Sequence, residues 1–136
     1  MFLRIQTDGG SRGNPGPAGL GVVIKDEQGT IVEEHARYLG KMTNNQAEYL
    51  AVIVGLERCA ALGATEVEVV ADSELLIKQA KGEYRVKNPD LQTRFREMKG
   101  FEAQIGKVKY RHVRREYNTE ADALANKAMD QGMGRA

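Results

Sequence analysis

Four carboxylates stand where the surrounding sequence gives no simple reason for an acid. Asp8 ends an alternating apolar run, and Asp72 ends the run "TEVEVVAD". Glu48 is the only charged residue from position 42 to position 56, and Asp122 lies within "NTEADALA". Carboxylates held close together repel, so either one of them raises its pKa or a cation lies among them. Oxygen ligands favour Mg²⁺ or Mn²⁺, and a pair of such ions suits phosphoryl transfer.

Each acid also has a structural explanation. Asp8 could start a turn, and Asp72 could cap the short helix that follows it. Asp122 could form a capping pair with Thr119, and Glu48 could pair with an arginine. Taken singly, the structural explanation is better for Asp72 and Asp122 and equally good for Asp8. Glu48 is the hardest to explain this way, because its helix is apolar over most of its circumference and glutamate is almost never buried without a partner.

The first acid is followed by the stretch "TDGGSRGNPGPAGLG", residues 7–21. Such a stretch is common in turns, because glycine adopts positive φ and proline presets φ. It also suits a backbone that approaches a ligand closely without intervening side chains. The chain contains no G-x-x-x-x-G-K-[ST] motif, so a P-loop is excluded as the phosphate site.

The elements that must position these acids alternate between strands and helices. Strands are predicted at 2–8, on both sides of a turn near 26–30, at 65–72 and at 107–114. Helices are predicted at 44–62, at 73–81, from Asn88-Pro89 to about 100–104, and at 119–131, with Thr43 and Gln46 as a capping box and Gly63 beyond the first helix. This order predicts an α/β fold with a mixed sheet, antiparallel hairpins first and parallel strands after, flanked by helices.

A right-handed crossover through helix 44–62 would make the strands that end at Asp8 and Asp72 parallel neighbours. Their carboxyl ends would then meet where open α/β sheets place ligands. In the last strand Lys107, Lys109 and Arg111 share one face, which is typical of an edge strand protected against aggregation.

The composition is that of an ordinary globular domain. The chain has 136 residues, of which 41% are hydrophobic and 29% are charged. One domain spanning 1–136 is therefore expected, with a flexible tail from about 132 to 136. The net charge of +1 means that any nucleic-acid surface must be a local patch. Cys59 has no partner for a disulfide, which suits a reducing compartment, and a cytoplasmic monomer with no membrane partner is expected.

Four segments of the chain resemble the signature segments of the type 1 ribonuclease H family, in the order of that family. They are "TDGGSRGNPGPAGLG", "MTNNQAEYLAVIVGLE", "VVADSELL" and "NTEADALAN", and together they span nearly the whole chain. The resemblance implies the ribonuclease H-like fold, a five-stranded mixed sheet flanked by helices. It also implies divalent-metal-dependent hydrolysis of the RNA strand of RNA–DNA hybrids, leaving 3′-hydroxyl and 5′-phosphate ends.

The same resemblance implies roles for particular residues. Asp8, Glu48, Asp72 and Asp122 would be the catalytic acids and would bind two Mg²⁺ or Mn²⁺ ions when substrate is bound. The expected substrate-binding residues are Gly9, Gly10, Ser11, Arg12, Asn14, Thr43, Asn44, Asn45, Glu74, Tyr84, Lys87 and Asn118. Thr43 is expected to hold a phosphate of the DNA strand, and the glycine-rich loop is expected to lie against the hybrid. Double-stranded RNA is a further partner left open.

The chain departs from the best-studied members of the family in four places. Only "GEYRVK" stands where they carry a basic helix and loop. Tyr84 replaces a tryptophan, and Glu74 replaces a glutamine that contacts substrate. The loop before Asp122 lacks a histidine, and Arg114 or Arg115 is expected to act in its place.

Two other functions are compatible with the same fold. One is a non-catalytic hybrid-binding domain, and the other is a different nuclease or a strand-transfer enzyme of the same superfold. Clustered negative charge near phosphates opposes mere binding, which disfavours the first. Asn44, Asn45 and the glycine-rich stretch disfavour the second.

Overall fold

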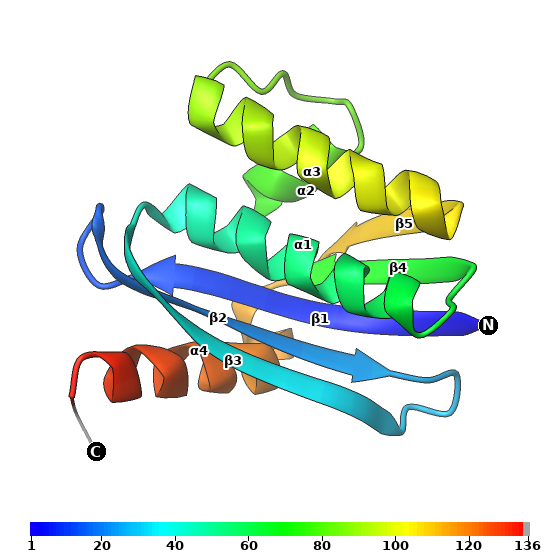
Figure 1. Ribbon diagram of the computed structural model, residues 1–136, viewed down its shortest axis with the longest axis horizontal. Helices are drawn as coiled ribbons and strands as arrows, with labels where there is room; N and C mark the ends of the chain where they lie inside the picture. Colours follow the sequence, from blue (N-terminus) through cyan, green and yellow to red (C-terminus); the bar gives the residue numbers. More distant parts are fainter. Residues whose placement is uncertain (135–136) are drawn as a thin grey trace.

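The computed structural model describes residues 1–134 and contains one five-stranded sheet flanked by helices (Figure 1). The strands are β1 (Phe2–Ser11), β2 (Gly16–Lys25), β3 (Ile31–Met42), β4 (Glu66–Ala71) and β5 (Lys107–His112). The helices are α1 (Asn44–Ala61), α2 (Glu74–Ala80), α3 (Pro89–Ile105) and α4 (Thr119–Gly132), with a 3₁₀ turn at Arg115–Tyr117. Within residues 1–134 no helix has the length and apolar character needed to cross a membrane.

The strand order β3-β2-β1-β4-β5 confirms the mixed sheet predicted from the sequence. Strands β1, β2 and β3 are antiparallel, whereas β1–β4 and β4–β5 are parallel. The parallel pairing of β1 with β4 ends at Thr7 and Ala71, so Asp8, inside β1, and Asp72, just beyond β4, directly follow the last paired positions of two neighbouring strands. Strand β5 is an edge strand, as its alternating charges predict.

The glycine-rich stretch differs from the loop expected there. Strand β1 continues through Gly9 and Gly10 to Ser11, because these residues pair with β2 as far as Ala18. Only residues 12–15 form the connection, with Arg12 N donating to Pro17 O at 2.8 Å. The glycines therefore belong mainly to a hairpin of the sheet, and the expectation of a long loop was wrong.

Helix α1 packs on one face of the sheet and α4 on the other (Figure 1). Two glycines let these helices approach the strands closely. A Cβ on Gly9 would collide with the backbone carbonyl of Ala47 in α1, and a Cβ on Gly21 would collide with that of Ala121 in α4. Both helices are thus held against the strands that carry the candidate site.

Replacing Gly21 with alanine is expected to lower the free energy of unfolding by about 1–3 kcal/mol, because overpacking against helix backbone forces α4 away. Urea denaturation measures the change. Gly100→Ala is the control, since its helical position has nothing within 4 Å. That change should stabilise the protein by up to about 1 kcal/mol, because alanine favours a helix more than glycine does. Equal stability of the Gly21→Ala variant and the wild type would contradict this account of the packing.

The helix ends leave the acids free of capping roles. The predicted capping box of Thr43 and Gln46 is confirmed, and Gly63 adopts positive φ just beyond α1. Ser73, rather than Asp72, caps α2. Helix α4 has no side-chain cap, so the capping pair considered for Asp122 does not form.

The remaining boundaries shift only slightly from the sequence predictions. Asn88 caps α3 with proline at its start, as predicted, and the helix ends at Ile105. Strand β5 ends at His112, and α4 continues to Gly132. The predicted flexible tail therefore begins inside α4, and its last two positions, 135–136, lie outside the described residues.

Candidate active site

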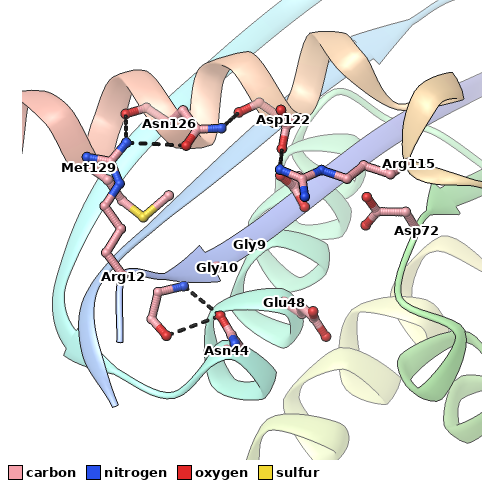
Figure 2. A pocket seen from close by; sticks show the side chains of 12 residues that line it. Gly9, Gly10, Arg12, Asn44, Glu48, Asp72, Arg115, Asp122, Asn126 and Met129 are labelled. Atoms are coloured by element: carbon pink, nitrogen blue, oxygen red, sulfur yellow. Dashed lines mark hydrogen bonds and ion pairs between the residues drawn. The ribbon is translucent and has the colours of Figure 1, made fainter. Parts of the chain in front are cut away.

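All four sequence-predicted acids line one pocket of about 420 Å³ (Figure 2). Asp8 comes from β1, Glu48 from α1, Asp72 from the end of β4, and Asp122 from the first turn of α4. The remaining lining residues are Gly9, Gly10, Ser11, Arg12, Asn44, Arg115, Asn126 and Met129. Acids from both ends of the chain and from its middle are thus brought to one concave surface.

The Asp8 carboxyl shows the strongest electrostatic perturbation in the pocket. Burial and the neighbouring charges of Asp72, Asp122 and Glu48 raise the pKa of Asp8 from 3.8 to about 8. Burial disfavours the charged form, and each nearby carboxylate adds repulsion. A proton or a cation is therefore needed to relieve the charge at this position.

Glu48 and Asp72 are perturbed in the same direction. Burial raises the pKa of Glu48 from 4.5 to about 7, with hydrogen bonding from Ser73 opposing the shift. Within residues 1–134 Glu48 has no ion pair, so the arginine partner considered from the sequence is absent. Burial also raises the pKa of Asp72, while its own backbone hydrogen bond and Arg115 oppose the shift.

Arg115 forms an ion pair with one of the acids in this pocket. Its Nη2 lies 3.2 Å from Asp122 Oδ1, although the Arg115 side chain is 76% exposed (Figure 2). Arg114 instead pairs with Glu116 and lies over the ring of Tyr117. Of the two arginines proposed to replace the loop histidine, only Arg115 lines the pocket.

The donor set fits a divalent metal. All four acids supply carboxylate oxygens, which Mg²⁺ and Mn²⁺ prefer, and a cation would relieve the repulsion that, together with burial, raises the pKa of Asp8. In the described chain no three His, Cys, Asp or Glu side chains are grouped so that they alone could hold a metal ion. Mg²⁺ is commonly bound by one or two carboxylates together with water and substrate phosphates, so water and substrate oxygens would have to complete the ligand set here.

Polar residues at the end of β1 and in the hairpin connection form hydrogen bonds with the start of α1. Ser11 donates its backbone N–H (2.7 Å) and its hydroxyl (3.1 Å) to Asn44 Oδ1. Asn14 Oδ1 accepts a hydrogen bond from Asn44 N at 3.1 Å. These contacts hold Ser11 and Asn44, which line the pocket beside Gly10, in fixed positions.

Arg12 lines the pocket, but its guanidinium is directed toward α4. Nη1 forms an ion pair with Asp130, and Nη2 donates to Asn126 O and Oδ1. Arg12 thus connects the hairpin to the last helix. Its guanidinium is already bound by α4, so a contact of Arg12 with substrate stays a prediction. Asn126 and Met129 were missed in the sequence, because only the packing of α4 on the sheet brings them here.

A second pocket of about 230 Å³ lies beside the first turns of α1 and α3. Asn14, Thr43 and Asn45, all predicted from the sequence, line it. Gln46, Asn88, Asp90 and Leu91 complete its lining, and of these Asn88 was identified in the sequence only as the start of a helix. The short 81–88 connection between α2 and α3 places the last three here.

Asn118 was expected to contact substrate, but the structure buries it completely. Its Nδ2 donates to Thr7 O at 2.8 Å, directly before Asp8, and its own carbonyl accepts from Asp122 N at 3.1 Å. Asn118 therefore connects the two acids through the backbone.

Asn118→Ala is expected to lower the free energy of unfolding by about 1–3 kcal/mol, because Thr7 O loses its buried donor. The rate of hybrid cleavage, the reaction that the sequence resemblance implies, should fall as well, because α4 is no longer fixed relative to β1. Urea denaturation and cleavage assays measure the two effects, with the exposed neighbour Thr119→Ala as the control. Wild-type stability in the Asn118 variant would contradict the assigned role.

The remaining predicted substrate residues lie outside the main pocket. Glu74 pairs with Lys78 at 2.7 Å, and Lys78 Nζ lies 4.9 Å from the centre of the Tyr84 ring. Tyr84 and Lys87 are exposed on the connection between α2 and α3. The pocket itself therefore does not depend on them.

Comparison with known proteins gives a consistent result. Residues 6–128 match the family described as reverse transcriptase-like. The chain is 45% identical over 131 residues to a bifunctional protein of Mycobacterium tuberculosis, covering 96% of this chain and 36% of that protein. It is 42% identical to ribonuclease HI of Halobacterium salinarum, covering 90% and 62%. The chain thus spans between about a third and two thirds of these curated relatives.

Solved structures agree in fold. The RNase H1 structure from Halobacterium salinarum has a TM-score of 0.93 at 40% identity, covering 96% of this chain and 99% of that one. LC11-RNase H1, isolated from compost and solved with an RNA/DNA hybrid, has a TM-score of 0.92 at 43% identity, with coverage of 96% and 99%. With four acids in one pocket and this agreement over nearly the whole chain, the protein belongs to the type 1 ribonuclease H family.

Proposed function

We propose that this chain is an endoribonuclease that hydrolyses the RNA strand of RNA–DNA hybrids and leaves 3′-hydroxyl and 5′-phosphate ends. The observation that carries the proposal is the convergence of four carboxylates from four separate elements on one pocket. Membership of the ribonuclease H family supports the reaction, and the hybrid bound to LC11-RNase H1 supports the substrate.

Asp8, Glu48, Asp72 and Asp122 would hold the divalent metal, Mg²⁺ or Mn²⁺, with two ions when substrate is present. When bound, the metal activates a water molecule and stabilises the leaving oxygen of the phosphodiester. None of the four acids caps a helix, so helix capping does not account for them.

The chain's own polar groups account for recognition of RNA. RNA differs from DNA by the 2′-hydroxyl, which lines a wide and shallow minor groove. Gly9 and Gly10 place backbone beside the acids without side chains, and Asn44 is oriented by Ser11. Small groups and amides of this kind can contact 2′-hydroxyls irrespective of base sequence.

The second pocket suits a phosphate of the DNA strand. Its lining is mainly hydroxyl and amide groups, and it lies at the N-terminus of the 18-residue helix α1, where backbone dipoles favour anions. The Thr43 hydroxyl already accepts a hydrogen bond from Gln46 N at 3.2 Å. A hydroxyl that accepts can still donate its own proton. One hydroxyl can therefore both cap α1 and bind a phosphate.

Cleavage of labelled substrates tests the function directly. Hybrid, RNA duplex and DNA duplex are each incubated with Mg²⁺, with Mn²⁺ and with EDTA, and the products are resolved on a gel. The expected result is metal-dependent cleavage within the RNA strand of the hybrid. Cleavage of the DNA duplex would favour another nuclease of the same fold, and binding without cleavage under every condition would favour a hybrid-binding domain.

A further inference from the structure

The segment of residues 107–115, "KVKYRHVRR", has a strongly one-sided charge. It contains five lysine and arginine residues and no acid, in a chain whose net charge is only +1. The side chains of Lys107, Lys109, Arg111, Arg114 and Arg115 are all exposed. A quarter of the 20 basic residues thus form one local positive surface, which is where a nearly neutral protein can bind a polyanion.

This segment leads directly to the candidate active site. Strand β5 lies at the edge of the sheet, paired only with β4, and it runs toward the carboxyl end where the acids lie (Figure 1). At the usual rise per residue of a strand, β5 is about 20 Å long, and its alternate side chains are about 7 Å apart. Arg115, just beyond the strand, already contacts Asp122 in the pocket. The positive surface and the pocket are therefore continuous.

Nearby acids neutralise only part of this charge. Lys107 lies 3.6 Å from Glu66, and Arg111 lies 3.4 Å from Glu68. Glu68 is already bound by Arg4 at 2.6 Å, and Lys109 has no ion pair within the described chain. Exposed pairs of this kind are weak, so the lysines and arginines remain available to another anion.

A hollow beside β5 adds further basic side chains. A groove of about 440 Å³ is lined by Lys81, Lys99 and Lys109, with Glu102 and Tyr110. Lys99 is held by Ala80 O at 2.7 Å and by Glu102, whereas Lys81 and Lys109 are exposed at the groove. The hollow is shallow and open and carries three lysines against one glutamate, so a phosphate-bearing strand can reach its lysines.

Protection of a sheet edge explains the presence of charge on β5 but not its sign. Either sign, or both, would discourage pairing with another chain. The opposite edge strand, β3, carries two glutamates against one arginine and one lysine. Of the two edge strands only β5 is uniformly positive, so its charge calls for an anionic partner.

We propose that Lys107, Lys109, Arg111 and Arg114, the β5 basic track, bind the phosphodiester backbone of nucleic acid outside the catalytic pocket. The identity of that nucleic acid as the hybrid rests on the proposed function. At a rise of about 3.4 Å per base pair, a track of about 20 Å covers roughly six base pairs of the flanking duplex. The connection between α2 and α3 is short in this chain. The track would therefore add positive charge to that which this connection can offer a nucleic acid.

The test compares two double variants that each remove two positive charges. Lys109→Gln/Arg111→Gln changes the track, and Arg37→Gln/Lys127→Gln changes exposed residues on β3 and α4. Fluorescence anisotropy measures binding to a hybrid and to a DNA duplex of about two helical turns, in EDTA and across a salt series. Because backbone contacts do not read sequence or sugar, the track variant should weaken binding to both duplexes about tenfold, and the salt slope should fall by about 1.8.

The control variant should bind within about twofold of the wild type, since long-range effects of distant charges are screened. Lys109→Arg/Arg111→Lys should retain wild-type affinity, and the thermal midpoint of each variant checks its fold. Equal effects of the track and control variants, or an unchanged salt slope, would overturn the proposal. If the wild type fails to cleave hybrid while the track variant still loses affinity, the proposed function is contradicted, but binding of nucleic acid by the β5 basic track is supported.

Discussion

Asp8→Asn is expected to lower the rate of hybrid cleavage by at least about 10³-fold while making the folded protein more stable at pH 8. The substitution keeps the shape of the side chain but removes a carboxylate from the centre of the acidic pocket. Removing one group that stabilises charge in a transition state commonly costs about 10²–10³-fold, and if Asp8 holds the metal as proposed, its loss should cost at least as much.

The gain in stability has the same cause as the loss of activity. Burial and three neighbouring acids raise the pKa of Asp8 to about 8, so its ionised form destabilises the folded state. A neutral amide removes that repulsion, as is common when a strained functional group is replaced. Single-turnover cleavage and thermal unfolding at pH 8 in EDTA measure the two effects. Glu57→Gln, an exposed change of the same charge on α1, should alter neither.

A variant with near-normal cleavage would remove Asp8 from the catalytic set. A variant that is inactive but also less stable than the wild type would indicate that Asp8 holds the fold together. Only the combination of lost activity with gained stability identifies a carboxylate that is kept at an energetic cost for catalysis.

The acids could be found in the sequence because their chemistry conflicts with their local surroundings. Glu48 interrupts an apolar helix. Asp8 and Asp72 end runs whose parallel pairing follows from the crossover rule. Neither inference needs a side-chain position. The mixed sheet, with antiparallel strands first and parallel strands after, and the edge position of β5 were predictable for the same reason, since element order and hydrophobic period carry that information.

The details that differed depend on contacts between distant segments. Gly9 and Gly10 have low strand propensity, yet they extend β1 because β2 pairs with them and α1 packs on Gly9. Asn118 is an amide in a signature segment, and nothing local shows that it is buried against Thr7 O rather than exposed to substrate. Arg12 is likewise directed by Asp130, 118 positions away.

The metal-free protein is expected to lose stability as the pH rises from about 4 to about 8. The pKa of Asp8 is about 8 in the folded state against 3.8 for the ordinary side chain, and that of Glu48 is about 7 against 4.5. Between these values the folded state binds more protons than the unfolded state, so the free energy of unfolding falls with increasing pH. Glu33, whose pKa is lowered to about 2 by Arg58 and His35, contributes its opposite effect only below about pH 4.5.

Thermal unfolding in EDTA at half-unit steps from pH 4.5 to 8.5 measures this slope, and Asp8→Asn should remove most of it. A divalent cation binds ionised carboxylates and stabilises only the folded state, so Mg²⁺ should raise the midpoint more at pH 8 than at pH 6. A flat profile in EDTA would show that the four acids do not repel one another as their shared pocket requires. A steep profile that Mg²⁺ leaves unchanged would mean that protons, rather than metal ions, are what this pocket is built to hold, and the metal-dependent reaction would then have no binding site in the chain.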